Sequence, residues 1–182
     1  MRKWDRSKAL AALESFGLHG TNASLAVYWL SLWNGDRPPE RGAFNPAQVK
    51  DLLPAIAITE VRQSGDAVCR LSGTFIDMAI GQPMLGLNVV SLVENEHRQI
   101  RRARLRTLVD GGVALSKVRY EGPSGEDAFA EVLQLPFYGP MEDGSRQFLA
   151  HISWRPTMSR PNSPGRIEYA GMPEEYFAAT LL

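Results

Sequence analysis

Three strand-like segments near the C-terminal end, separated by short glycine-containing turns, constrain the fold of this chain more than any other feature. They cover about residues 113–121, 127–136 and 146–154. The turns between them contain Gly122-Pro123-Ser124-Gly125 and the glycines of residues 139–144. Turn residues between runs of β-branched and aromatic residues are typical of hairpins. The simplest arrangement is an antiparallel meander of three strands.

A further pair of strands is predicted earlier in the chain. Apolar residues alternate with other residues over about 56–61, and a second run covers 68–71. The turn Ser64-Gly65-Asp66 separates the two runs and Gly73-Thr74 ends the second, so we expect a hairpin. With the meander, this hairpin brings the predicted number of strands to five.

The remaining periodic segments indicate helices. Apolar residues recur at helical spacing over about 4–16, 21–33 and 94–110, and a short terminal helix is predicted at 174–182. Residues 75–93 contain two glycines and a proline, so only short helical turns fit there. The predicted fold class is therefore α+β: a five-stranded antiparallel sheet with helices on one face, plus N-terminal helices. This layout leaves room for a pocket between the sheet and the helices.

The composition is that of an ordinary globular domain, with 44% apolar and 22% charged residues. Because 20 Lys and Arg balance 20 Asp and Glu, no overall field attracts nucleic acid or an anionic membrane. Cys69 is the only cysteine, and the sequence contains neither a signal-peptide core nor a run of about 18 apolar residues. We expect a cytoplasmic protein with an N-terminal helical extension at 1–21, a central domain at 22–155, and a Pro-rich linker and tail at 156–182.

Several short motifs follow one another in a characteristic order across residues 22–154. They are Tyr28-Trp29, Arg37-Pro38-Pro39-Glu40-Arg41, Asn45-Pro46, Leu53-Pro54, Arg70-Leu71-Ser72-Gly73-Thr74, Gly81 with Gly86, and Leu135-Pro136. In these motifs the chain resembles the PAS superfamily, and most of all a bacterial subgroup of small stand-alone PAS proteins. The resemblance implies two strands, several helices and then three strands. It also implies a sensor of small molecules, cofactors or redox state, or a dimerising interaction module.

The resemblance also indicates how a signal would leave the protein. No kinase, cyclase or DNA-binding output is visible, and only about 20 residues flank the predicted core at each end, too few for an output domain. We therefore expect the signal to pass to a signalling protein or through a homodimer contact.

A small-molecule pocket is expected between residues 75–85, the inner face of the helix at 94–110 and the sheet. The candidate ligand-binding residues are Arg70, Phe75, Met78, Met84, Leu85, His97, Ile100 and His151. Flexible or aromatic apolar side chains suit the wall of such a pocket, or else they fill a closed core. Arg70 either enters the pocket to bind an anion or forms an ion pair on the sheet surface.

Two residues bear on cofactors. PAS domains that bind haem place an axial histidine near the start of the long helix, where His97 lies, but a lone histidine among charged neighbours is typical of a solvated helix residue. Photoactive flavin binding in PAS relatives needs a cysteine in a helical motif, whereas Cys69 lies in a predicted strand, where a buried, inert thiol is expected. The sequence therefore does not identify a cofactor. Haem bound through His97 is one alternative, and a photoactive flavin is disfavoured.

Five arginines crowd the helix predicted at 94–110, namely Arg98, Arg101, Arg102, Arg104 and Arg106. Such a run suits a phosphate-bearing ligand or an acidic partner. The predicted inward stripe of this helix consists of Ile100, Ala103, Thr107 and Leu108. Most of the arginines should therefore be solvated or should pair with Glu94 and Glu96, and nucleic-acid binding is not expected.

The predicted helix at 21–33 carries an aromatic-rich face that includes Tyr28, Trp29 and Trp33. In PAS proteins the leading helix commonly packs across a dimer. These three residues are therefore candidates for a dimer or partner interface, and the alternative is that they belong to the intramolecular core.

An enzyme is the least favoured class. The sequence contains no nucleophile elbow, phosphate loop, dinucleotide fingerprint or metal-binding histidine pair. Glu131 and His151 lie on predicted neighbouring strands, which leaves an acid–base pair open. Three hypotheses follow in order: a ligand-binding sensor, an interaction adaptor with a filled core, and a small α+β enzyme of the cone-shaped type with several polar groups converging in its cavity.

Overall fold

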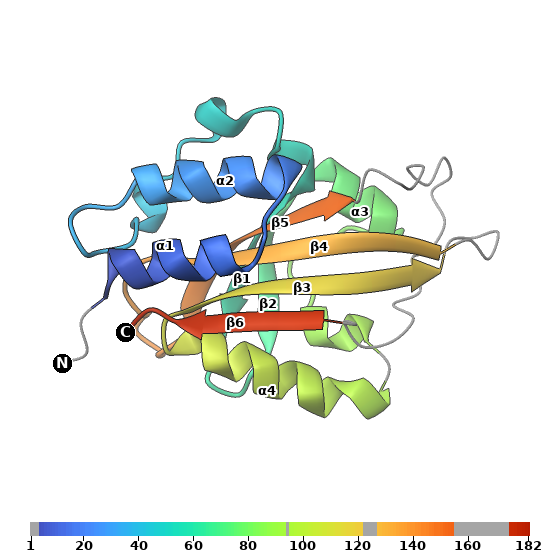
Figure 1. Cartoon of the computed structure of the whole chain (residues 1–182). Coiled ribbons are helices and arrows are strands. Elements are labelled where there is room, and N and C mark those ends of the chain that lie inside the picture. Colours follow the sequence, from blue (N-terminus) through green and yellow to red (C-terminus); the bar gives the residue numbers. More distant parts are fainter. Residues whose placement is uncertain (1–3, 94, 122–126, 155–174) are drawn as a thin grey trace.

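A single antiparallel sheet of six strands forms the centre of the computed structural model, which describes residues 4–93, 95–121, 127–154 and 175–182. The strands are β1 (Ile56–Val61), β2 (Ala67–Ser72), β3 (Gly112–Glu121), β4 (Asp127–Pro136), β5 (Arg146–Trp154) and β6 (Glu175–Thr180). Their spatial order is β2-β1-β5-β4-β3-β6, with every neighbouring pair antiparallel (Figure 1). The predicted hairpin and the predicted meander are both confirmed as β1–β2 and β3–β4–β5.

The sixth strand corrects the predicted terminal helix at 174–182. β6 pairs with β3 from Gly112 opposite Thr180 to Lys117 opposite Glu175, so the sheet has six strands rather than five. Glutamate and alanine in this segment favour a helix, but pairing with the edge of β3 satisfies a whole row of backbone groups, and such tertiary context overrides propensity. The predicted linker before β6 lies outside the described residues.

Four α-helices and several 3₁₀ turns complete the fold. The helices are α1 (Arg6–Ser15), α2 (Gly20–Ser31), α3 (Thr74–Ile80) and α4 (Arg98–Val109), and the last two 3₁₀ turns are Val89–Leu92 and Asn95–His97. The carboxylate of Asp5 caps α1 by accepting hydrogen bonds from the backbone N–H groups of Ser7 and Lys8. Within the described ranges, no helix combines the length and the apolar character needed to cross a membrane.

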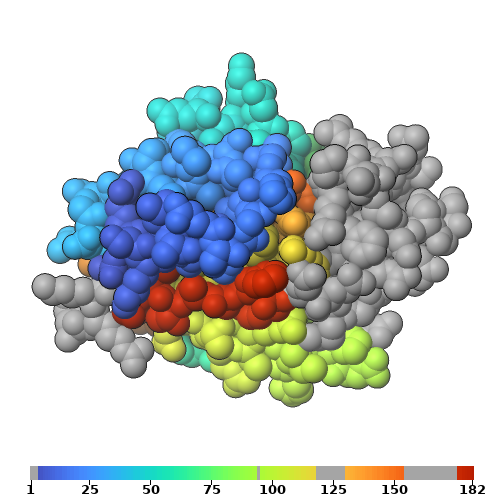
Figure 2. All heavy atoms as spheres, viewed as in Figure 1, coloured from blue at the N-terminus to red at the C-terminus, as the bar shows by residue number. Residues whose placement is uncertain are grey.

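The helices cover both faces of the sheet. Leu133, Leu135 and Leu149 pack with α1 and α2 on one face, whereas Ala150 packs with α3 on the other because successive strand residues point to opposite sides. Figures 1 and 2 show α1 and α2 in blue across the near face, with β6 in red between α1 and α4. The N-terminal helices, whose place the sequence did not indicate, therefore share a core with the sheet.

Two of the three interface candidates belong to that core. Trp29 is 0% exposed and Trp33 is 9% exposed, and their rings meet edge to face with centroids 5.1 Å apart. The indole Nε1 of Trp29 donates a hydrogen bond to the carbonyl of Pro136 at 3.1 Å. Tyr28 is half-buried, and its hydroxyl bonds to the backbone of Asn45. The intramolecular alternative therefore accounts for both tryptophans.

Candidate ligand-binding site

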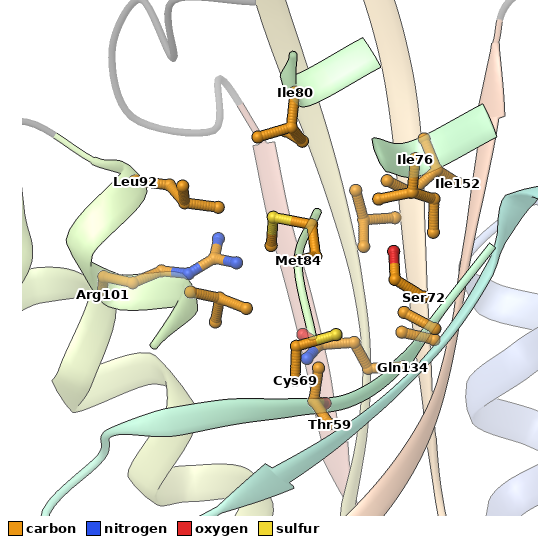
Figure 3. A pocket seen from close by; sticks show the side chains of 14 residues that line it. Thr59, Cys69, Ser72, Ile76, Ile80, Met84, Leu92, Arg101, Gln134 and Ile152 are labelled. Carbon is orange, nitrogen blue, oxygen red and sulfur yellow. The ribbon is translucent and has the colours of Figure 1, made fainter. Parts of the chain in front are cut away.

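A cavity of about 60 Å³ lies between the sheet and the helices α3 and α4. Its floor consists of residues from β1, β2, β4 and β5, and its walls come from α3, the 3₁₀ turn Val89–Leu92 and α4 (Figure 3). A water molecule needs roughly 10–15 Å³ of such space, whereas drug-sized ligands occupy sites of about 300–1,000 Å³. The cavity therefore suits a ligand of a few heavy atoms.

The walls of the cavity are mostly apolar. Ile76 and Ile80 lie one turn apart on α3, so both side chains point toward the sheet (Figure 3). Gly81 ends α3 in the left-handed conformation with φ of 77°. After this turn the backbone N–H of Met84 donates to the carboxylate of Asp77 at 3.0 Å, and the Met84 side chain is buried against the cavity. Local capping chemistry thus fixes this wall.

Among the described residues, four polar side chains interrupt the apolar lining, namely Thr59, Ser72, Gln134 and Arg101. Thr59 and Gln134 are each 6% exposed, and neither Thr59 Oγ1 nor Arg101 Nε has a hydrogen-bond partner in the described part of the chain. Leaving buried polar groups unpaired is costly, more so for a charged group. Both of these unpaired atoms belong to side chains that line the same cavity.

Cys69 also lines the cavity from β2 and is buried, as predicted. Its Sγ donates a hydrogen bond to the carbonyl of Leu71 at 3.2 Å. Burial is the largest influence on this thiol and raises its pKa, so the protonated form prevails at neutral pH. A thiol in that state is a poor nucleophile.

Of the residues singled out from the sequence for the 75–85 segment, Met84 lines the cavity. Met78 and Leu85 are 61% and 69% exposed, and Phe75 is half-buried and outside the lining. The phase of α3 is the reason, because the positions four residues apart that face the sheet are Ile76 and Ile80. The four-residue spacing of Ile76 and Ile80 is the sequence signal that would have identified them as cavity residues, whereas the chemistry of the side chains did not.

Arg70 does not enter the cavity. It is the extra residue of a β-bulge, since Thr59 pairs with Cys69 and Ile58 pairs with Leu71. Its guanidinium forms two hydrogen bonds of 2.9 Å with the carboxylate of Glu60. The alternative of an ion pair on the sheet surface therefore describes Arg70.

The inward face of α4 also differs from the prediction. Leu108 is buried as expected, but Ile100 is 47% exposed and Ala103 and Thr107 are exposed as well. The buried residues are Leu105, Leu108 and Val109, and Arg101 lies one turn before Leu105 on the same side. Arginine can occupy an inward position because its long apolar stem packs against the core, which the prediction did not allow for.

Three other arginines of α4 have partners within the protein. Arg98 donates to the carbonyls of Ser91 and Val93, Arg102 forms a 2.9 Å ion pair with Asp66, and the guanidinium of Arg104 lies 4.7 Å from the ring centre of Tyr176. The hydrogen bonds from Asn88 and Arg102 lower the pKa of Asp66. Much of the basic run therefore anchors α4, and Glu94, one of its predicted partners, lies outside the described residues.

The two histidines singled out from the sequence lie outside the cavity lining. His97 Nε2 is 3.3 Å from Glu96 Oε1. His151 is buried on the α2 side of the sheet, where its Nδ1 lies 2.8 Å from Asn22 Oδ1. Because Asn22 Nδ2 donates to the carbonyl of Glu131 at 3.3 Å, Asn22 Oδ1 is an acceptor and His151 Nδ1 carries the proton. Glu131 and His151 thus lie on the face opposite to the cavity.

Because His151 is buried, we predict that the protein loses stability against unfolding in mild acid. Burial lowers the pKa of His151 from 6.5 to about 4, so the unfolded chain binds a proton more readily than the folded protein does. The contribution of His151 to the free energy of unfolding is therefore fully present above pH 6.5 and is lost as the pH decreases toward 4, by about 2 kcal/mol between pH 7.5 and 5. Urea unfolding at these pH values should show this loss in the wild type.

Two variants serve to assign this loss to His151. His151→Asn retains an N–H donor near Asn22 and should lack this part of the pH dependence. His19→Asn, at an exposed position, should retain it in full. Equal losses of stability in the wild type and in His151→Asn would contradict the assignment.

Comparison with known proteins agrees with this architecture. The family model described as PAS domain matches residues 18–150, so the chain belongs to the PAS domain family. Members of this family are sensory and regulatory modules, and the chain is one in that general sense. No curated protein matches the chain.

Solved PAS structures show limited similarity to the chain. The PAS domain of an HTR-like protein from Haloarcula marismortui is 18% identical with a TM-score of 0.42, over 60% of this chain and 90% of that one. Drosophila melanogaster Cycle PAS-B, solved with bound ethylene glycol, is 13% identical with a TM-score of 0.39, over 54% and 99%. A sensory box histidine kinase/response regulator from Burkholderia thailandensis is 10% identical with a TM-score of 0.37, over 60% and 84%.

Proposed function

We propose that this protein is a PAS sensor that binds a small organic ligand in the cavity between the sheet and α3 and α4, and that ligand binding changes a contact with a signalling protein or a second copy of the chain. The observation that carries the proposal is the cavity of about 60 Å³, which has mostly apolar walls and contains two polar atoms, Thr59 Oγ1 and Arg101 Nε, without hydrogen-bond partners in the described part of the chain. Well-packed cores hold few voids larger than a water molecule. A retained cavity of this chemistry therefore favours the sensor over an adaptor with a filled core.

The placement of the walls supports a signalling role. Residues of α3, of the turn Val89–Leu92 and of α4 all line the cavity, so a ligand would contact three segments that are separate in the sequence. A ligand that fits one arrangement of these segments better than another shifts the protein toward that arrangement. The outer surfaces of α3 and α4 are then the surfaces that a partner would sense.

The enzyme alternative has less support. It predicts polar groups in the cavity, and four are present. However, Glu131 and His151, the acid–base pair on which this alternative rested, lie on the other face of the sheet. The residues that line the cavity in the described part of the chain include no carboxylate or imidazole, which are the usual groups for general acid–base catalysis.

A cavity-filling variant tests the proposal. Ala150 lines the cavity from β5, and Ala150→Val adds two methyl groups there. The new side chain is β-branched and therefore suits a strand. We expect 1-propanol, propionamide or propionate to shift the methyl NMR signals of Ile76, Ile80 and Met84 in the wild type. Ala150→Val should abolish these shifts and change the stability by less than about 1.5 kcal/mol.

The matched control is Ala103→Val on the exposed side of α4, which should bind the probes as the wild type does. The methyl group of Ile56, which packs in the core on the opposite face of the sheet, should not respond to any probe. If none of the three probes shifts the cavity methyl groups, or if Ala150→Val responds as the wild type does, the cavity is not a binding site.

A further inference from the structure

The charge of the cavity points to a chemical class of ligand. We propose that the cavity binds a small organic monoanion, an aliphatic carboxylate, with its carboxylate at Arg101 and its hydrocarbon part against the isoleucine-rich wall. This inference rests on the proposed function, since it specifies the ligand of the same cavity. It does not depend on which partner receives the signal.

The first argument is the contrast between Arg101 and its neighbours on α4. Arg98 and Arg102 have carbonyl or carboxylate partners, and Arg104 lies against the ring of Tyr176, although its Nη1 is also buried without a hydrogen-bond partner in the described part of the chain. Arg101 has no such partner in the described part of the chain, and its Nε is buried. Figure 3 shows its side chain extending from α4 into the cavity, between Leu92 and Met84. Arg101 as a whole is half-buried, and no carboxylate lines the cavity in the described part of the chain, so the cavity offers its guanidinium no counter-charge.

The second argument comes from the opposite side of the cavity. Thr59 on β1 and Gln134 on β4 are both more than nine-tenths buried and line the same space. A hydroxyl and a carboxamide can each donate a hydrogen bond to an anionic oxygen. The hydroxyl of Thr59 has no partner in the described part of the chain, so donors are available on the sheet side as well as on the helix side.

The remaining lining decides between an organic and an inorganic anion. Arg101 is the one charged residue among the described residues that line the cavity, so a single negative charge balances the site and a dianion would leave a charge unpaired in an apolar space. Ile76, Ile80 and Ile152 offer contacts that an inorganic ion cannot use. A monoanion with a short aliphatic chain uses both features.

An isosteric pair of probes tests the inference. Propionate and propionamide have nearly the same shape and differ in charge. Titration followed by the methyl signals of Ile76, Ile80 and Met84 should give the wild type an affinity for propionate that is roughly tenfold or more above that for propionamide, as a charge-assisted hydrogen bond provides. Inorganic phosphate should bind more weakly than propionate.

Arg101→Met keeps the apolar stem and removes the charge. We expect it to lower the affinity for propionate by roughly tenfold or more and to leave the affinity for propionamide unchanged. Arg106→Met, which removes an exposed arginine from the same helix, should change neither affinity. The comparison of propionate with propionamide uses the wild type alone. It therefore shows whether the cavity prefers an anion even if Arg101→Met does not fold.

The outcomes separate this inference from the proposed function. If propionamide shifts the cavity methyl signals and binds as tightly as propionate, the cavity is a ligand site, but the inference that it prefers an anionic ligand is wrong. If phosphate binds as tightly as propionate, the organic part of the inference is wrong. If no probe shifts these signals, the proposed function fails and the inference fails with it.

Discussion

Gly73→Ala is expected to destabilise the protein by about 3 kcal/mol or more. Gly73 precedes α3, and a Cβ atom at this position would lie closer than 3.0 Å to the backbone carbonyls of Leu53 and Pro54. Its φ of −73° is available to any residue, so the cost comes from the contact and not from backbone strain. The backbone cannot easily retreat, because the N–H of Gly73 donates to the carbonyl of Ile56 at 2.8 Å.

Chemical denaturation of Gly73→Ala beside Gly42→Ala measures this effect. A Cβ at Gly42 would meet no atom within 4 Å, so this control should change the stability by less than about 0.5 kcal/mol. Because Gly73 leads directly into the helix that carries Ile76 and Ile80, the variant should also disturb the cavity wall. A stability of Gly73→Ala within about 1 kcal/mol of the wild type would show that the carbonyls of Leu53 and Pro54 are not packed against this position.

Trp29→Ala is expected to cost about 3–5 kcal/mol, as the removal of a large buried aromatic side chain generally does. Trp29 is fully buried in the core formed by α1, α2 and the sheet, and it contacts Trp33. The substitution also leaves the carbonyl of Pro136 without its indole donor. Trp29→Phe should cost less, since it keeps most of the buried ring and loses the hydrogen bond.

The same variant distinguishes a core residue from an interface residue. Denaturation curves recorded at two protein concentrations, together with size-exclusion chromatography, separate a loss of monomer stability from a loss of association. Val27→Ala on the same helix, where the valine is 67% exposed, should change the stability by less than about 0.5 kcal/mol. If Trp29→Ala alters only the concentration dependence, Trp29 acts at an interface after all.

The sequence predicted β1 to β5 with their ends to within one residue, but it did not predict β6. Alternation and turn residues located β1 to β5 because these signals are local. The segment of β6 contains Glu175 and two alanines, which locally favour a helix, and its strand conformation depends on pairing with β3, about sixty residues earlier in the chain. No local pattern carries information of that kind.

The cavity was harder to predict than the fold. The sequence indicated the segment 75–85 and the helix at 94–110 as its walls, but the residues singled out in them were chosen for chemistry, and of these Met84 lines the cavity. Exact helix phase separates Ile80 from Met78 and Arg101 from Ile100, and a shift of one residue rotates a side chain by about 100°. An arginine on an inward face also contradicts the rule that charges face water, which is why Arg101 was named as a member of the basic run and not as a residue of the cavity.

The pairing of β3 with β6 has a consequence for how the chain is made. A ribosome adds about 5–20 residues per second, so the backbone groups on that side of β3 emerge several seconds before the strand that covers them. An uncovered strand edge readily pairs with another chain. During synthesis the nascent protein should therefore pass through a short period in which chaperone binding or premature association competes with the pairing of β3 and β6.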